Sequence, residues 1–264
     1  MRASVGLLIL LAGHPVVQGQ VPPWLAPEGE KLTYALSYLH VVAGTMELSA
    51  QPTPEGVRLV MEARSTPSFS RFFSVNNRIE TLLQKNPLSL VRQHAKIAEG
   101  KRQFEEVVVV DPEGTMARRF RDGQEKSAVT ISEPVLDTLG AIFALRTLEL
   151  APSRAFALNV LSGKEVYPLL VVVTGRQTVK LASGKTESFV VEPRFRQGGL
   201  LKSESKLTLY VSTDGRHVPL RIVSQLPFGS ITATLVAVTP PLATAGAKMM
   251  AVDPEVNDYG AENR

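Results

Sequence analysis

The sequence predicts a mainly β protein: a large curved antiparallel sheet with one principal buried helix. Through most of the chain, apolar and polar residues alternate with a period of two between turns rich in Gly, Pro and Asp. Only residues 135–150 are strongly helical, and they are apolar on nearly all sides. About a dozen strands are expected. Sheets of that size curl, split or close, so a half-barrel, a barrel and a sandwich all remain open.

The first strands follow a proline-rich segment, residues 20–28. Every second residue from Leu32 to Tyr38 is apolar or aromatic, which predicts a half-buried strand with Tyr34 and Tyr38 on one face. Residues 45–50 are expected to return beside it. A turn at 52–56 then leads into a further alternating strand.

The remaining strands are separated by turn signals such as Asp111-Pro112 and Asp214-Gly215. Two runs, residues 107–110 and 169–173, are apolar at every position, which is typical of strands covered on both faces. The other predicted strands are residues 57–64, 78–84, 90–98, 104–110, 115–121 and 128–131, and then 155–161, 166–173, 177–182, 187–192, 206–212, 218–222 and 231–238.

The principal helix is expected to begin after Glu133-Pro134, with Asp137 as its cap, because an aspartate there accepts a hydrogen bond from an otherwise unpaired amide. Arg146 and Glu149 are its only charged interruptions. Such a helix is normally buried, so we expect it on or inside the curved sheet. A second, short helix is expected near residues 68–73.

The N-terminus predicts export. Arg2 precedes an apolar run at residues 5–12, which is too short to span a bilayer, and small residues follow it. We therefore expect a signal peptide at residues 1–19, a leader at 20–28, one β-rich domain at 29–239 and a disordered tail at 240–264. The mature protein is expected in the periplasm or outside the cell, with no transmembrane span. Cysteine is absent, which excludes disulfides, thiol nucleophiles and a lipid-bearing thiol.

The chain is basic, with a formal charge of +4 and a pI of about 9.4. Nucleic acid is excluded as a partner of an exported protein. Arg118, Arg119 and Arg121 cluster on one predicted strand and form either a cationic patch or a solvated outer face.

No catalytic constellation is evident, and we predict no catalytic residues, no metal ligands and no cofactor. The mature chain has three histidines, His40, His94 and His217, and no two share a metal-binding spacing. A Gly-x-Ser-x-Gly elbow is missing. The phosphate-loop-like end at residues 182–186 lacks its first glycine, because position 179 is Val179.

Several ordered motifs resemble an exported bacterial family called domain of unknown function 3108. They are GEKLTY at 29–34, AGT at 43–45, VLDTL at 135–139, FALR at 143–146, LTLYVSTDGRHVP at 207–219 and FGSITATL at 228–235. The resemblance covers roughly residues 29–238. It implies a mainly β fold and a location in the cell envelope, and it supplies no established activity or catalytic residues.

Our leading hypothesis is a non-enzymatic envelope protein that binds a hydrophobic or amphipathic ligand in a cleft between the sheet and the helix. Its candidate ligand-binding residues are Tyr34, Tyr38, Leu139 and Phe143, with the tyrosine hydroxyls as a polar rim. Candidate partners are a lipid, a peptide or an envelope polysaccharide. An envelope scaffold or assembly factor is the alternative, followed by a glycan hydrolase that uses two carboxylates. An apolar cleft favours the first hypothesis, an exposed aromatic patch the second, and two convergent buried carboxylates the third.

Overall fold

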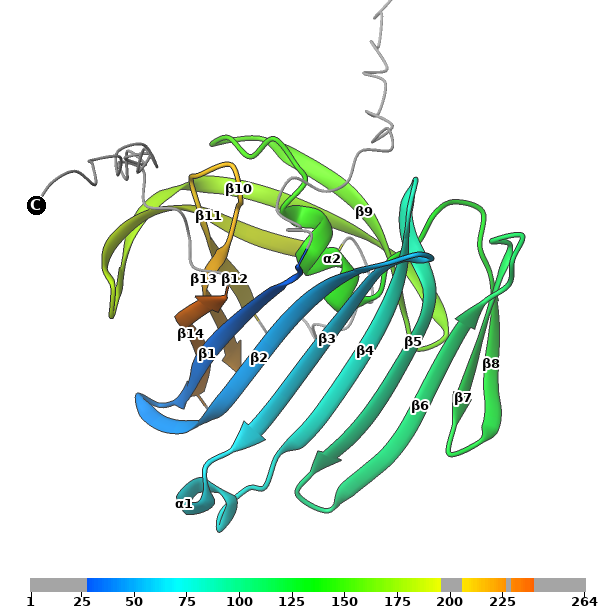
Figure 1. Cartoon of the computed structure of the whole chain (residues 1–264), viewed down its shortest axis with the longest axis horizontal. Helices are drawn as coiled ribbons and strands as arrows, with labels where there is room; N and C mark the ends of the chain where they lie inside the picture. Colours follow the sequence, from blue (N-terminus) through cyan, green and yellow to red (C-terminus); the bar gives the residue numbers. More distant parts are fainter. Residues whose placement is uncertain (1–27, 196–205, 227–228, 240–264) are drawn as a thin grey trace, which may run out of the picture.

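The computed structural model describes residues 28–195, 206–226 and 229–239. Within these ranges, fourteen strands form one antiparallel sheet in the order β8-β7-β6-β5-β4-β3-β2-β1-β14-β13-β12-β11-β10-β9. Figure 1 shows this sheet curling around the helix α2. The two edge strands, β8 and β9, are not paired with each other, so the sheet is curved but not closed. The predicted fold class is confirmed.

The sheet consists of two meanders, each made of consecutive strands that pair with their neighbours in sequence. Strands β1 and β14 pair with each other, for example at Leu36 opposite Ala233, and this joins the meanders into one sheet. The first meander comprises β1 (Glu30–Tyr38), β2 (Val41–Thr53), β3 (Gly56–Ser65), β4 (Asn76–Lys85), β5 (Leu88–Glu99), β6 (Arg102–Val110), β7 (Met116–Arg121) and β8 (Gln124–Thr130). The second comprises β9 (Ala155–Ser162), β10 (Glu165–Leu181), β11 (Gly184–Phe195), β12 (Lys206–Ser212), β13 (Pro219–Leu226) and β14 (Gly229–Thr239).

The principal helix, α2 (Thr138–Leu145), is shorter than the predicted 135–150. Asp137 is its cap, as expected, and accepts a hydrogen bond from the Gly140 amide at 2.7 Å. Val135 and Leu136 are extended, because their backbone groups bond to the sheet instead of to a helix. The Val135 carbonyl accepts from Leu90 of β5 at 2.7 Å, and the Leu136 amide donates to Asn159 of β9 at 2.8 Å. This segment therefore links β5 of the first meander to the edge strand β9 of the second.

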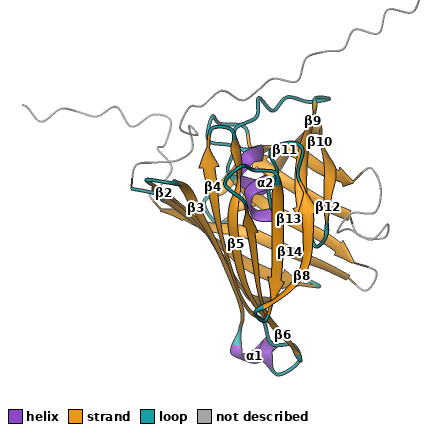
Figure 2. Ribbon diagram, turned by 90° about the vertical axis from the view of Figure 1, so that its right-hand side faces the viewer, coloured by secondary structure: helices purple, strands orange, loops and turns teal. Residues whose placement is uncertain are grey.

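The second helix, α1 (Pro67–Ser70), begins one residue before the predicted segment and ends three residues earlier. Its cap is Thr66, whose hydroxyl accepts from the Phe69 amide at 3.2 Å. Figure 2 shows α1 at the far tip of the strands, whereas α2 lies inside the curve of the sheet nearer the other end. The concave face thus has a filled end and an end that α2 does not reach.

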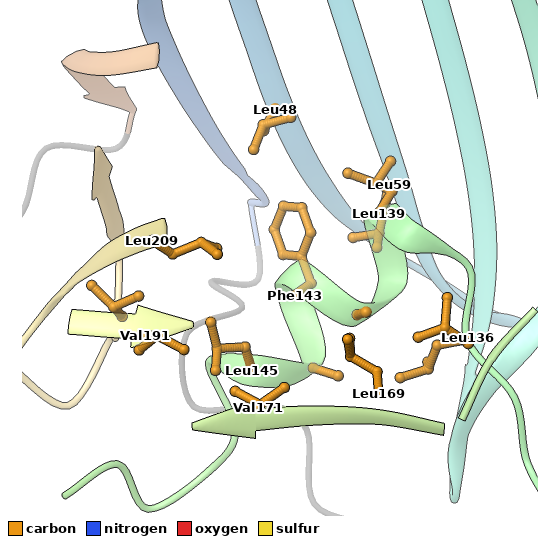
Figure 3. Close-up of a cluster of buried hydrophobic side chains, with 14 of the residues drawn as sticks. Leu48, Leu59, Leu136, Leu139, Phe143, Leu145, Leu169, Val171, Val191 and Leu209 are labelled. Atoms are coloured by element: carbon orange, nitrogen blue, oxygen red, sulfur yellow. The ribbon is translucent and has the colours of Figure 1, made fainter. Parts of the chain in front are cut away.

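The core lies between α2 and the concave face. Figure 3 shows Phe143 pointing from α2 toward Leu48 and Leu59, which lie on β2 and β3. Val171 and Leu209 approach the other side of the helix from the second meander. All five side chains are at most 4% exposed. The two ends of the chain therefore build one core around a single helix.

The outer face is less covered than two all-apolar runs predicted. Val108 points inward and is 7% exposed, but its neighbour Val109 is 39% exposed. The expectation that residues 107–110 are covered on both faces is wrong for this strand. Two-sided apolar character here reflects β propensity, since Val is favoured in strands whether or not both faces are buried.

Candidate functional site

A large, mainly apolar cavity lies on the concave face at the α1 end. It has a volume of about 750 Å³ and is open to solvent on one side. Inward-facing residues of β1, β2 and β3 form its floor, and α1 with the loop after it forms one wall. The lining residues are Leu36, Tyr38, Ala43, Gly44, Ser65, Phe69, Phe72, Phe73, Val75, Glu99 and Ile231.

Local packing explains how this wall is placed. The rings of Tyr38 and Phe69 meet edge to face, with centroids 6.3 Å apart, so α1 is held against the end of β1. The next two strands approach closely at Gly44, where an added Cβ would lie 2.2 Å from the Arg64 carbonyl oxygen. Only glycine fits at that position.

The mouth of the cavity carries exposed apolar side chains. Eight large hydrophobic residues are exposed in the described part of the chain, and six of them lie at this end. We call these six the apolar mouth: Leu39, Val41, Val42, Phe72, Phe73 and Ile231, with Phe72 the most exposed at 88%. Three of them, Phe72, Phe73 and Ile231, line the cavity itself, and large exposed apolar patches mark binding sites.

Tyr38 is the one sequence-predicted site residue that lines this cavity. Tyr34 lies deeper and is fully buried, and its hydroxyl donates to the Pro219 carbonyl at 2.8 Å. Burial raises the pKa of Tyr34 far above its usual range, so its phenol stays protonated as a donor. The Tyr34 hydroxyl therefore forms a hydrogen bond inside the core and is not part of a polar rim.

Leu139 and Phe143 lie in the core, 5% and 1% exposed. A cleft between α2 and the sheet does exist, but on the opposite side of the helix. It is an apolar space of about 120 Å³ lined by Ala141, Ile142 and Leu145 against strands of the second meander. The structure thus separates the four candidate residues into one that lines the large cavity and three that are buried.

A charged cluster lies on the concave face of β6 and β7, outside the lining of this cavity. It consists of Glu106, Arg119 and Arg121, whose side chains are 15%, 17% and 32% exposed. Arg118 points outward to Glu125, at 3.3 Å. The sequence predicted these three arginines on one strand. Strict period-two alternation places the Arg118 side chain on the opposite face of that strand from the other two.

Several other titratable side chains are in structural contacts. Asp137 is fully buried and accepts from Thr81 and Gln93, both at 2.5 Å. Burial raises the pKa of Asp137 despite these donors. His217 donates through Nδ1 to the Arg146 carbonyl at 3.2 Å, and His94 contacts Glu105. No group of three metal-ligating side chains occurs within residues 28–195, 206–226 and 229–239.

Residues 32–236 match the family described as "Protein of unknown function (DUF3108)". The chain belongs to this family. The resemblance seen in the ordered sequence motifs is therefore confirmed. No curated protein matches this DUF3108 protein.

The fold of this DUF3108 protein is similar to that of a solved structure, the "Beta-barrel-like Protein of Domain of Unknown Function DUF1849 from Brucella abortus". The two are 11% identical, the match covers 81% of this chain and 98% of that chain, and the TM-score is 0.57. At this identity the likeness is one of fold alone. None of the helices in the described ranges has the length and apolarity needed to cross a bilayer.

Proposed function

We propose that this DUF3108 protein is a non-enzymatic protein of the cell envelope that binds a hydrophobic or amphipathic ligand on the concave face of its sheet. The observation that carries the proposal is the apolar cavity of about 750 Å³ beneath the apolar mouth. Its volume lies in the range typical of ligand sites, and its lining is mainly aliphatic and aromatic.

The chemistry of the lining favours an alkyl or acyl chain. Leu36, Phe69 and Ile231 offer apolar contact, whereas Glu99 is the one charged side chain of the lining. Each methylene group transferred from water into such a site gains about 0.8 kcal/mol. An occupying chain also covers the exposed Phe72 and Phe73, so both partners lose unfavourable contact with water.

The envelope location rests on the signal-like N-terminus, Arg2 followed by the apolar run at residues 5–12. N-terminal sequencing of protein recovered from a periplasmic or culture fraction is the test. We expect a mature N-terminus near residue 19 or 20. Full-length protein confined to the cytosol would contradict the location.

The binding proposal is tested with two tryptophan substitutions on one strand. Ile231 points into the cavity, while Val236 lies on the outer face of the same strand and is similarly exposed, at 51% against 41%. Protein is purified from its own envelope, examined by native mass spectrometry and extracted for lipid. We expect wild type and Val236→Trp to carry ligand and Ile231→Trp to lose it. Ligand-free wild-type protein, or equal retention by both variants, would contradict the proposal.

A second candidate, an envelope scaffold, is favoured by the exposed aromatic pair Phe72 and Phe73. A photoreactive phenylalanine analogue at position 72 separates the two candidates. A lipid adduct supports ligand binding at the mouth, whereas a protein adduct supports the scaffold.

A further inference from the structure

The concave face carries more positive than negative charge at the β6–β7 cluster. One carboxylate oxygen, Oε2 of Glu106, serves both arginines. It accepts from Arg121 through Nε at 3.1 Å and through a terminal nitrogen at 2.7 Å, and it lies 3.2 Å from Nε of Arg119. Two guanidinium groups and one carboxylate leave a surplus of one positive charge on this partly buried surface.

Two polar atoms beside this cluster lack a hydrogen bond although both are buried. They are Nε of Arg119, whose contact with Glu106 does not have hydrogen-bond geometry, and Oγ of Ser127. These residues lie directly opposite each other on β7 and β8. Buried donors without partners are costly and rare in folded proteins, so a pair of them on one cationic surface points to a missing acceptor.

The register of the strands places this cluster within reach of the cavity. Glu99 lines the cavity, and Ala95, four residues earlier on β5, pairs with Glu106. Four residues span about 13 Å along a strand, and two strand spacings add about 10 Å across the sheet to reach Arg121. An extended alkyl chain of about a dozen carbons covers such a distance.

The surface between cavity and cluster begins with an aromatic side chain. Phe104 of β6 lies opposite Ile97 of β5, halfway between Glu99 and Ala95 in register. The guanidinium of Arg121 lies 4.2 Å from the centre of the Phe104 ring. A ligand that lies along this path therefore contacts the apolar ring of Phe104 and, directly beside it, the guanidinium of Arg121.

We propose that Arg119, Arg121 and Ser127 bind the oxyanion headgroup of an amphiphile whose tail lies in the cavity. The inference rests on the proposed function, because it assigns a headgroup to the ligand of that same site. A carboxylate or a phosphate supplies the acceptor oxygens that Arg119 and Ser127 lack and neutralises the surplus charge. The ligand is thus an anionic amphiphile with at least one acyl chain.

The test compares three probes that share a twelve-carbon chain: dodecanoate, dodecyl phosphate and the neutral 1-monolauroylglycerol. Each displaces the neutral dye N-phenyl-1-naphthylamine from full-length mature protein, and the fluorescence gives an affinity. We expect the two anions to bind at least roughly tenfold tighter than the neutral probe, the effect of one charge-assisted hydrogen bond. The stronger of the two anions identifies the headgroup as carboxylate or phosphate.

Two substitutions are expected to act with opposite sign. Arg119→Gln leaves the neutral pair of Glu106 and Arg121, so anion affinity falls roughly tenfold while the neutral probe is unaffected. Glu106→Gln raises the surplus to two charges, so anion affinity increases. Arg118→Gln, on the same strand but the outer face, is the matched control and changes neither.

The outcomes separate the headgroup site from the cavity. Equal binding of all three probes, unchanged in Arg119→Gln and Glu106→Gln, overturns the headgroup site and leaves the cavity proposal intact. Binding of none of them overturns the proposed function itself. If Arg119→Gln weakens every probe through local disorder, the Glu106→Gln variant decides: tighter anion binding supports the site, and weaker binding overturns it.

Discussion

Two clusters in this molecule share one composition, a glutamate with two arginines, yet they differ in almost every other respect. In the sealed cluster, Glu30, Arg146 and Arg216 have side chains that are 1%, 0% and 25% exposed. Arg146 bonds to Oε2 of Glu30 at 2.5 Å and to Oε1 at 3.1 Å, and its Nε donates to the Arg216 carbonyl at 3.1 Å. Both carboxylate oxygens are therefore used, and all three nitrogens of the buried guanidinium have an acceptor.

In the open cluster of Glu106, Arg119 and Arg121, one carboxylate oxygen contacts both arginines, and a buried arginine nitrogen has no hydrogen bond. Its members lie on adjacent strands, whereas the sealed cluster joins the start of β1, the end of α2 and the turn before β13. A buried charge is tolerated only when it is fully paired. We therefore conclude that the sealed cluster fixes the helix inside the sheet. The open cluster leaves a buried nitrogen without a hydrogen bond and is the better candidate for a ligand-binding site.

The largest expected effect comes from breaking the sealed cluster. Arg146→Met removes the partner of a buried carboxylate, and we expect the free energy of unfolding to fall by about 3–5 kcal/mol. Arg121→Met in the open cluster is the comparison and is expected to cost about 1 kcal/mol or less, because its ion pair is partly solvated. Urea unfolding followed by circular dichroism measures both. Equal losses would mean that the two clusters do not differ in structural role.

The aromatic side chains sharpen the same contrast. Phe143→Ala at the filled end is expected to cost about 3–5 kcal/mol, because it leaves a large cavity in a packed core. Phe72→Ala at the apolar mouth is expected to change stability by no more than about 0.5 kcal/mol, since the side chain is 88% exposed. The same unfolding experiment compares them. A loss below about 1 kcal/mol for Phe143→Ala would show that α2 is not packed as described.

The two tyrosines of β1 provide a comparison within one strand. Tyr34→Phe leaves the buried Pro219 carbonyl without its donor, and we expect a loss of about 1–3 kcal/mol in stability with no change in ligand affinity. Tyr38→Ala is expected to weaken binding of the twelve-carbon probes, because Tyr38 lines the cavity. Unfolding and dye displacement on both variants give the two readouts. Weaker ligand binding in Tyr34→Phe at unchanged stability would reverse this assignment.

Much of the filled end could be predicted from sequence because it depends on local patterns. Period-two alternation gives the strands and the shared face of Tyr34 and Tyr38, and Asp137 is recognisable as a cap from its place before an apolar run. The predicted helix was too long at both ends, since α2 ends at Leu145. At its start, tertiary hydrogen bonds hold Val135 and Leu136 extended. Helix propensity takes no account of hydrogen bonds between a segment and distant strands.

The long-range pairing in the sealed cluster and the end of the sheet that α2 does not reach were harder to predict. Glu30 and Arg146 are separated by 116 residues, and no local signal pairs them. Phe72 and Phe73 lie in a loop, where exposure depends on the tertiary fold and not on a period. The shared face of Arg119 and Arg121 could be predicted from the sequence, since alternation alone places them on the other face of the strand from Arg118. Which face is concave follows only from the curvature of the complete sheet.

The smallest expected effect is a pH dependence at the edge of the sealed cluster. Burial lowers the pKa of His217 below its ordinary value of 6.5, although the nearby Arg146 carbonyl and Asp214 act in the opposite direction. The folded state therefore favours neutral His217, and the unfolded chain binds the proton more readily. The stability that depends on neutral His217 is complete above about pH 6.5 and is lost as the pH falls from there through the lowered pKa.

His217→Asn is the test, because asparagine tolerates the positive φ of 46° at this position. We measure the free energy of unfolding of wild type and variant from pH 8 to about pH 5, a range that brackets the ordinary histidine pKa. The difference between them is expected to shrink only slightly on acidification, since His217 is only partly shielded from solvent. His40→Asn is the matched control for the substitution, since His40 also has a positive φ, of 70°, and lies exposed in the turn between β1 and β2. If wild type and His217→Asn stay parallel across the whole range, the sealed cluster holds no proton-linked contribution from His217, and its stability comes from Glu30, Arg146 and Arg216 alone.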